Sequence, residues 1–205
     1  MKKFELTNEF ITNMFGTKLF RIRALVEFGD VEAGELGGYV EKESNLGHDD
    51  NAWVYDNAWV YGDAQVSGDA WVYGDAQVSG DARVYGDAQV SGNALVCGNA
   101  LVYDNAWVYG NALVCGDARV CGNGDYAYAH GFGSVNRTTT FFRLKDGGVG
   151  VRCGCFYGTL AQFRDKIRET HGETKKAQEY LMLADLMELR FEEDENEVGN
   201  RKYVE

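Results

Sequence analysis

The chain has 205 residues, with 26 glycines, no proline, five cysteines and a formal net charge of −12. A surface this acidic repels phosphate backbones and anionic lipid headgroups, so DNA, RNA and membranes are poor candidate partners. No apolar run reaches the roughly 18 residues that a membrane span needs, and the first residues, MKKFELTNEF, lack the apolar stretch of a signal peptide. These features predict a soluble protein of a reducing cytoplasm.

The first segment, residues 1–38, is expected to form a strand or hairpin that covers the start of the fold. Alternate residues of KLFRIRALVEF are apolar and share one side: Phe20, Ile22, Ala24 and Val26. Such alternation is typical of a strand with one buried side. A stacked β-array needs a cap of this kind because its open edge invites further strands.

A six-residue repeat fills the middle of the chain. Valine recurs at every sixth position from Val54 to Val120, and an alanine follows four residues after each valine but the last. A helix would turn these valines toward every side, whereas a coiled parallel β-structure accommodates a period of six. Alternation then points each valine inward and its neighbours outward. The glycine at each corner is expected to take a positive φ, as are Asp56 and Asp104, which replace it twice.

This pattern resembles the hexapeptide-repeat, left-handed β-helix family, in which an aliphatic residue, three variable residues, a small residue and another variable residue recur. In that family three hexapeptides, 18 residues, form one coil of a triangular prism. The resemblance therefore implies an all-β, left-handed parallel β-helix over residues 39–123, with the most regular match from Val54 to Cys121. At about 4.8 Å per layer, its four regular coils would stand roughly 19 Å tall.

Residues 124–191 are expected to form an α+β cap at the other end, with a β-hairpin and two helices. The hairpin is predicted from TTTFFRL, KDGG and VGVRCGCF. Thr159 can N-cap the first helix and Gly172 can end it, and the second helix is predicted from Lys175 to Phe191. Buried candidates of that helix are Ala177, Leu181, Ala184 and Leu186. The acidic tail, residues 192–205, carries too little apolar surface to order itself and is expected to be mobile.

Side chains 18 residues apart stack in columns on the three outer faces of such a prism. One face collects six large rings in two neighbouring columns: Trp53, Tyr55, Trp71, Tyr73, Trp107 and Tyr109. So much apolar surface on one wall indicates an interface with another chain, most simply another copy of this one. The resemblance favours a trimer, and a dimer stays open. The alternative is that aromatic residues suit strands and are half covered by their column neighbours.

The segment GFGSVNRTTTFFR carries the indication of a ligand. Arg137 offers a guanidinium fork suited to phosphate or carboxylate. Nearby side chains could donate hydrogen bonds to the same ligand or stack on a base: Ser134, Asn136, Thr138, Thr140, Tyr128 and Phe132. The alternative is a connector whose hydroxyls cap turns and whose arginine pairs with a local acid.

Many members of the resembled family are acyltransferases that use a coenzyme A thioester and a histidine base. Under that alternative the catalytic residue is His130 in YAYAHGFGS, which is expected to be a loop flanked by glycine. His48 and His130 belong to opposite ends of the prism, so a three-histidine metal site within one chain is not expected. His171, directly before Gly172, is expected to interact with the last carbonyls of its helix.

Two further groups of side chains raise the question of a metal ion. Cys97 and Cys115 are expected to stack in one column, and Cys153 and Cys155 to share one side of a strand. Aspartates are expected to stack at two corners, Asp63 over Asp81 and Asp69 over Asp87. Neither cysteine pair has the second half of a zinc site, so all four are expected to be reduced and structural. A cation could relieve the repulsion between stacked aspartates, but water and ionic screening do so at an exposed edge. No metal and no resident cofactor is predicted.

The layout of the whole chain resembles uncharacterised hexapeptide proteins that are common in bacteriophages and prophages. No activity carries over from them; the Arg137 segment and the aromatic face predict a non-catalytic, homo-oligomeric binding protein for a small anionic, nucleotide-like ligand. In the cytoplasm of a bacterial host cell, such a phage protein could sequester an immune signal. One alternative is the acyl-coenzyme A-dependent acyltransferase with His130 as its base. Another is a protein-binding scaffold or inhibitor that uses the tryptophan face.

Overall fold

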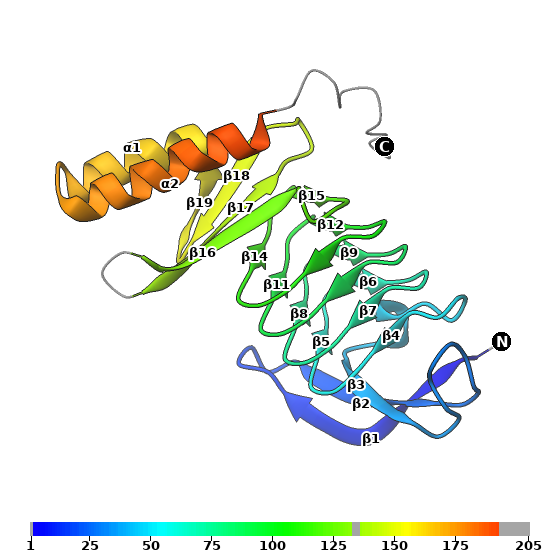
Figure 1. Ribbon diagram of the computed structural model, residues 1–205. Helices are drawn as coiled ribbons and strands as arrows, with labels where there is room; N and C mark the ends of the chain where they lie inside the picture. Colours follow the sequence, from blue (N-terminus) through cyan, green and yellow to red (C-terminus); the bar gives the residue numbers. More distant parts are fainter. Residues whose placement is uncertain (1, 133–135, 193–205) are drawn as a thin grey trace.

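The computed structural model describes residues 2–132 and 136–192, which form a parallel β-solenoid with a cap at each end (Figure 1). The predicted parallel β-helix with two caps is thereby confirmed. Its left-handed winding stays an expectation from the resemblance. Ser134, which was expected to contact a ligand, and the acidic tail from residue 193 onward lie outside the described residues.

The solenoid consists of two-residue strands stacked in three sheets. Residues 18 positions apart pair directly, as Trp71 does with Gln89, and the repeated valines and alanines fill the interior. The strands are β4 (Trp53–Val54), β5 (Trp59–Val60), β6 (Gln65–Val66), β7 (Trp71–Val72), β8 (Gln77–Val78), β9 (Arg83–Val84), β10 (Gln89–Val90), β11 (Leu95–Val96), β12 (Leu101–Val102), β13 (Trp107–Val108), β14 (Leu113–Val114) and β15 (Arg119–Val120). The strict period of six therefore produces one repeated rung with a continuous apolar core.

The corners of the solenoid require a backbone that few residues adopt. Gly98 has φ of +69°, and a Cβ added there would lie 2.8 Å from the backbone nitrogen of Gly116 in the next coil. Asp56 and Asp104 occupy equivalent corners with φ of 53° and 54°, as the sequence predicted. Close coil-to-coil approach, together with positive φ, explains why glycine recurs in this position.

The N-terminal cap extends one of the three solenoid sheets. Strands β1 (Phe4–Thr12), β2 (Lys18–Ala24) and β3 (Leu36–Val40) are antiparallel, and β3 then pairs in parallel with β5. A short 3-10 helix, η1 (Glu43–Asn45), follows. This cap covers the first coil, because Trp53 is fully buried between the rings of Phe4 and Phe28.

The C-terminal cap is a four-stranded antiparallel sheet covered by two helices (Figure 1). Its elements are β16 (Tyr126–Phe132), β17 (Arg137–Arg143), β18 (Val149–Cys153), β19 (Phe156–Thr159), α1 (Leu160–His171) and α2 (Lys175–Phe191). Thr159 caps α1 and Gly172 follows it, as predicted. The loop expected around His130 is instead strand β16, and Leu186, expected to be buried, is 54% exposed. Neither described helix is long and apolar enough to span a membrane.

Candidate functional site

The residues that the sequence assigned to one ligand site are divided between two sides of the C-terminal sheet. Successive side chains of a strand point to opposite faces. On β17, Phe142 belongs to the apolar core of the solenoid, whereas Phe141 belongs to the core under the helices. Thr138 and Thr140 therefore share the solenoid side, and Arg137 lies on the helix side. Because this polar segment is a strand, its side chains point to two opposite faces and do not form a single site.

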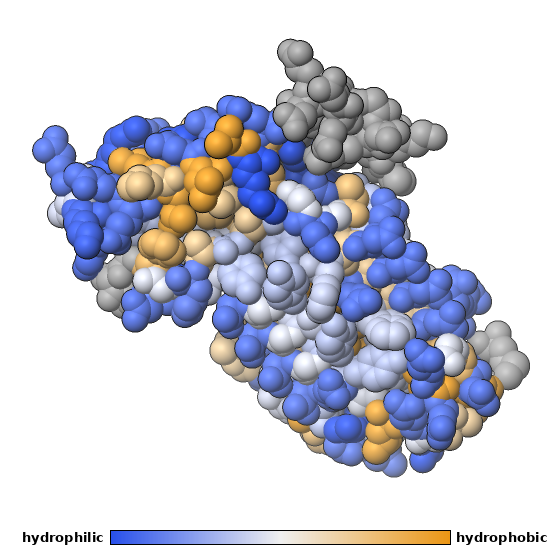
Figure 2. All heavy atoms as spheres, in the orientation of Figure 1, coloured by the Kyte–Doolittle hydropathy of each residue, from blue (hydrophilic) through white to orange (hydrophobic). Residues whose placement is uncertain are grey.

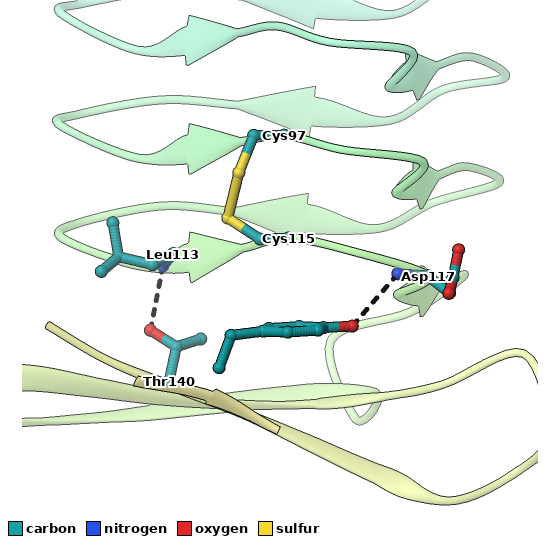
Figure 3. The surroundings of a disulfide bond; sticks show 6 residues. Cys97, Leu113, Cys115, Asp117 and Thr140 are labelled. Carbon is teal, nitrogen blue, oxygen red and sulfur yellow. Dashed lines mark hydrogen bonds between the residues drawn. A yellow bond between two sulfur atoms is a disulfide. The ribbon is translucent and has the colours of Figure 1, made fainter. Parts of the chain in front are cut away.

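Thr140 closes the end of the solenoid. It is fully buried, and its Oγ1 accepts a hydrogen bond from the backbone N–H of Leu113 at 2.9 Å (Figure 3). Tyr128 also packs against the solenoid core, and its hydroxyl lies so close to Gly110 that a Cβ there would clash with it. Both side chains are therefore engaged in joining the cap to the last coil, and neither lines the cavity described below.

The remaining predicted residues around Arg137 also lie away from that cavity. His130 is exposed, and its Nδ1 lies 2.9 Å from Oγ1 of Thr138 on the neighbouring strand. Asn136 is exposed in the turn before β17 with φ of 49°. Phe132 is partly buried against the core under the helices. The acyltransferase with His130 as its base therefore stays an untested alternative.

A cavity of about 260 Å³ opens between the β18–β19 turn and the two helices. It is lined by Arg137, Cys153, Cys155, Phe156, Phe163, Lys166, Ile167, Thr170, His171 and Tyr180. Three of these residues are Arg, Lys or His, and no acidic residue is among the described residues that line it. In a chain of net charge −12, this is a local reversal of charge. We call this site the cap pocket.

Arg137 is positioned at the cap pocket by a glycine. Gly154, in the β18–β19 turn, has φ of +59°, and a Cβ added to it would lie 1.8 Å from Nη1 of Arg137. The guanidinium therefore rests against bare backbone at the entrance to the cavity. A side chain at position 154 would both strain the turn and displace Arg137.

The wall of the cap pocket is aromatic and well packed. Phe163 contacts Phe156 at 5.4 Å and Tyr180 at 5.8 Å between ring centroids, and His171 stacks on Tyr180 at 5.9 Å. Burial raises the pKa of Tyr180 to about 12, the Cys153 thiol adds to the shift, and Arg137 opposes it. Tyr180 is therefore a neutral hydroxyl at physiological pH. The pocket combines cationic side chains with apolar rings, an arrangement that suits an anion carrying a flat ring.

The sequence did not identify the partners of Arg137 in the cap pocket. Phe163, Lys166, Ile167 and Thr170 follow one another at spacings that place them on one side of a helix. That pattern predicts a helix side, but not that this side faces Arg137 across the turn. His171 was expected to interact with its own helix end, and the structure stacks its ring on Tyr180 instead.

The six aromatic residues predicted to form one interface have different surroundings. Trp53 is fully buried under the N-terminal cap, so it is not available to a second chain. Tyr55, Trp71 and Tyr73 are half-buried. Trp107 and Tyr109 are 44% and 45% exposed. The prediction of one uniform wall failed for Trp53 because the N-terminal hairpin covers the first coil.

Cys97 and Cys115 form a disulfide bond between two consecutive coils (Figure 3). The expectation that both are reduced is wrong for this pair, because stacking 18 residues apart brings their Cα atoms to 4.5 Å. Cys121, Cys153 and Cys155 are free thiols. Among the residues that the structure describes, no three His, Cys, Asp or Glu side chains cluster as metal ligands would.

Comparison with protein families supports the solenoid. Three segments, residues 64–78, 76–92 and 96–110, match the model of the YdcK beta-solenoid repeat. All three lie within the repeat, and both caps lie outside the matched segments. A search of curated proteins found no match. These findings define the class, a repeat β-solenoid protein, and the function has to be argued from the site.

Proposed function

We propose that this protein binds a small anionic ligand in the cap pocket and does not transform it. The observation that carries the proposal is the approach of Arg137, Lys166 and His171 to one cavity in an acidic chain. An arginine fork can hold a phosphate or carboxylate through two parallel hydrogen bonds. Lys166 pairs with Glu169 at 2.8 Å, but both side chains are exposed, so this ion pair is weak and readily exchanged.

The size of the cap pocket narrows the ligand class. At about 260 Å³ it lies just below the usual range for sites of drug-sized ligands, roughly 300–1,000 Å³. That volume suits one ring and one anionic group, as in a nucleoside monophosphate, with Phe156 and Tyr180 available for stacking. It is small for coenzyme A or a dinucleotide. We therefore propose a mononucleotide-like ligand.

The test is an isothermal titration with three probes: adenosine monophosphate, inorganic phosphate and adenosine. We expect the monophosphate to bind most tightly, and Arg137→Ala to weaken its binding at least roughly tenfold. Arg152→Ala is the matched control, because this arginine pairs with Thr140 across the sheet and does not line the pocket. Equal affinity for Arg137→Ala and the wild type, or equal loss for Arg152→Ala, would contradict the proposal.

We also propose that the protein is a homo-oligomer. Two exposed apolar surfaces support this: Trp107 with Tyr109 on the solenoid, and the α2 stripe of Met182, Leu186 and Leu189, which are 71%, 54% and 67% exposed. Figure 2 shows apolar atoms gathered over the helices. Native mass spectrometry of Trp107→Glu and Leu186→Glu would show which surface holds the copies together. A monomeric wild type would overturn the proposal.

A mononucleotide-like ligand leads to a hypothesis about the biological role of the protein. A phage protein that retains a host signalling nucleotide in the bacterial cytoplasm would silence the response that this nucleotide triggers. The Cys97–Cys115 bond counts against a reducing compartment, since disulfides there are usually transient. Mass spectrometry of ligand retained by protein freshly purified from bacterial cytoplasm tests the ligand, and thiol labelling of the same sample tests the disulfide. A co-purified mononucleotide supports the hypothesis, and ligand-free protein contradicts it.

A further inference from the structure

A second hollow lies on the solenoid, over the sheet formed by β4, β7, β10 and β13. Two adjoining cavities of about 300 and 510 Å³ share Asp30, Tyr55, Trp71 and Gln89 among their lining residues. Because they share these four side chains, the two cavities form one groove, which we call the tryptophan groove. It is bounded at one end by the N-terminal cap, which contributes Asp30.

The floor of the tryptophan groove is a set of half-buried rings held in place by their neighbours. Tyr55 and Trp71 meet edge to face, with centroids 5.8 Å apart. The hydroxyl of Tyr73 donates a hydrogen bond to Oε1 of Gln89 at 3.3 Å. These contacts come from side chains one coil apart, so the stacking of coils supplies the ordered aromatic floor. The face of each ring carries partial negative charge and attracts cations.

The charged residues of the tryptophan groove all have one sign. Asp30, Asp56, Asp69 and Asp87 line it, and no basic side chain does so within the described part of the chain. Asp69 accepts hydrogen bonds from the backbone and side-chain nitrogens of Asn51 at 3.2 and 2.7 Å, so its carboxylate is oriented. Burial raises the pKa of Tyr55, and the negative charges of Glu35 and Asp30 raise it further. The contribution of these two carboxylates indicates a negative electrostatic potential at the floor of the groove.

We propose that the tryptophan groove binds a slender organic polycation of the linear polyamine class. One ammonium group would lie over Trp71 or Tyr55, and others would pair with the carboxylates on the rim. Asp69 and Asp87 stand one coil apart, about 4.8 Å, which is close to the spacing of two amines joined by three methylene groups. The methylene segments would lie on the rings. This site is separate from the cap pocket in residues and in charge, so it does not depend on the function proposed above.

The experiment is a calorimetric titration of the full chain with spermidine, with magnesium chloride and a neutral tetrasaccharide as comparison ligands. We expect saturable binding of spermidine that weakens with salt, and little heat from either comparison ligand. Trp71→Ala should weaken binding roughly tenfold. Trp107→Ala, in the same column but outside the groove, is the matched control and should bind as the wild type does.

A second variant keeps the test independent of folding. Asp30 is exposed in a loop of the N-terminal cap, so Asp30→Asn should leave the fold intact and weaken spermidine binding several-fold. The same affinity in Asp30→Asn as in the wild type would overturn the proposal. Tighter binding of the tetrasaccharide than of spermidine, or equal binding of magnesium, would also overturn it. A lysine-rich peptide serves as a further comparison ligand, and tighter binding of this peptide than of spermidine, dependent on Trp71, would overturn it as well. The last result would assign the groove to a protein partner.

Discussion

The two ends of the solenoid are closed by side chains of opposite hydrogen-bonding character. Outside the paired strand valines, the N–H groups of the ladder donate to carbonyls of the next coil, as Trp53 N does to Ala70 O. The first coil therefore leaves carbonyls without a preceding partner, and the last coil leaves N–H groups without a following one. These particular groups need donors in the first cap and acceptors in the last.

The N-terminal end supplies mainly donors, although Glu41 Oε2 accepts from the backbone N–H of Gly62 at 2.7 Å. Lys3 Nζ donates to the carbonyls of Ala52 at 2.8 Å and Asp50 at 3.2 Å. Asn45 Nδ2 donates to the carbonyls of Gly62 and Ala64 at 3.0 and 2.8 Å. Both Lys3 and Asn45 are buried, so each is a polar group retained in the interior for a specific partner.

The C-terminal cap supplies mainly acceptors, although the Tyr126 hydroxyl also donates to the carbonyl of Trp107 at 2.8 Å. Backbone N–H groups of the last coil donate to side-chain oxygens: Trp107 to Asn123, Tyr109 to Tyr126, Leu113 to Thr140, Asp117 to Tyr157 and Cys121 to Asp125. The sequence of the coils repeats because each inner coil packs between two similar coils. The two end coils each pack against a cap instead, so they need residues that occur only once in the chain. The unrepeated residues are accordingly where both capping and the cap pocket are found.

The largest expected effect comes from reversing polarity at the first cap. Asn45→Asp replaces a buried donor with a carboxylate that faces two carbonyls, and should lower the free energy of unfolding by at least about 3 kcal/mol. Urea denaturation measures this loss. Asn105→Asp, at an exposed corner, is the control and should change stability little. A loss below about 1 kcal/mol for Asn45→Asp would contradict the donor role.

The disulfide should stabilise the coils next to the C-terminal cap. Cys97→Ser opens a crosslink with a sequence separation of 18, and should cost about 3 kcal/mol by releasing entropy of the unfolded chain. Cys155→Ser, an exposed free thiol, should cost little. Thiol labelling of the unfolded, unreduced chain should modify the three free cysteines, Cys121, Cys153 and Cys155. Labelling of all five would show that the bond is not formed.

Stability should rise with pH through the titration of Lys3. Burial lowers its pKa from 10.5 to about 8 in the folded protein, although Asp50, Asp49 and Asp69 oppose the shift. Between these two pH values the unfolded state binds more protons, so the free energy of unfolding increases, by at most about 3 kcal/mol. The difference between wild type and Lys3→Met in urea unfolding across this range isolates the effect. An equal slope in both proteins would contradict it.

A smaller effect is expected at the second cap. Thr140→Val keeps the shape but removes the acceptor of the Leu113 N–H, which should cost about 1–2 kcal/mol. Thr140→Ser retains the hydroxyl and should lose less than Thr140→Val. Thr138→Val, two residues earlier on the same strand, is the control and should be nearly neutral. Thermal or urea unfolding ranks the three variants, and equal losses for Thr138→Val and Thr140→Val would contradict the capping role.

The repeat could be predicted from the sequence because it is local. Valines six apart and glycines at the corners determine each rung without reference to the rest of the chain. The position of Trp53 could not be predicted in this way, since its column points outward and only the N-terminal hairpin buries it. Strand β16 was missed because Gly131 and Gly133 suggested a loop around His130.

Only part of the cap pocket could be predicted from the sequence. Arg137 was identified by its chemistry, but Thr138 and Thr140 were grouped with it because they are adjacent in the chain. Because the segment is a strand, the alternation of its side chains puts the two threonines on the opposite face from Arg137. The basic partners of Arg137 in the pocket come from α1. How a helix packs on a sheet depends on the whole core, so Lys166 and His171 could not have been assigned to Arg137 beforehand.

We propose that the C-terminal sheet closes the solenoid with one side and holds the ligand with the other. This proposal is tested most directly by titrating adenosine monophosphate into Arg137→Ala and Thr140→Val below their unfolding temperatures. We expect Thr140→Val to bind as the wild type does, while Arg137→Ala loses at least about tenfold in affinity. Lost binding in folded Thr140→Val, with wild-type binding in Arg137→Ala, would contradict it.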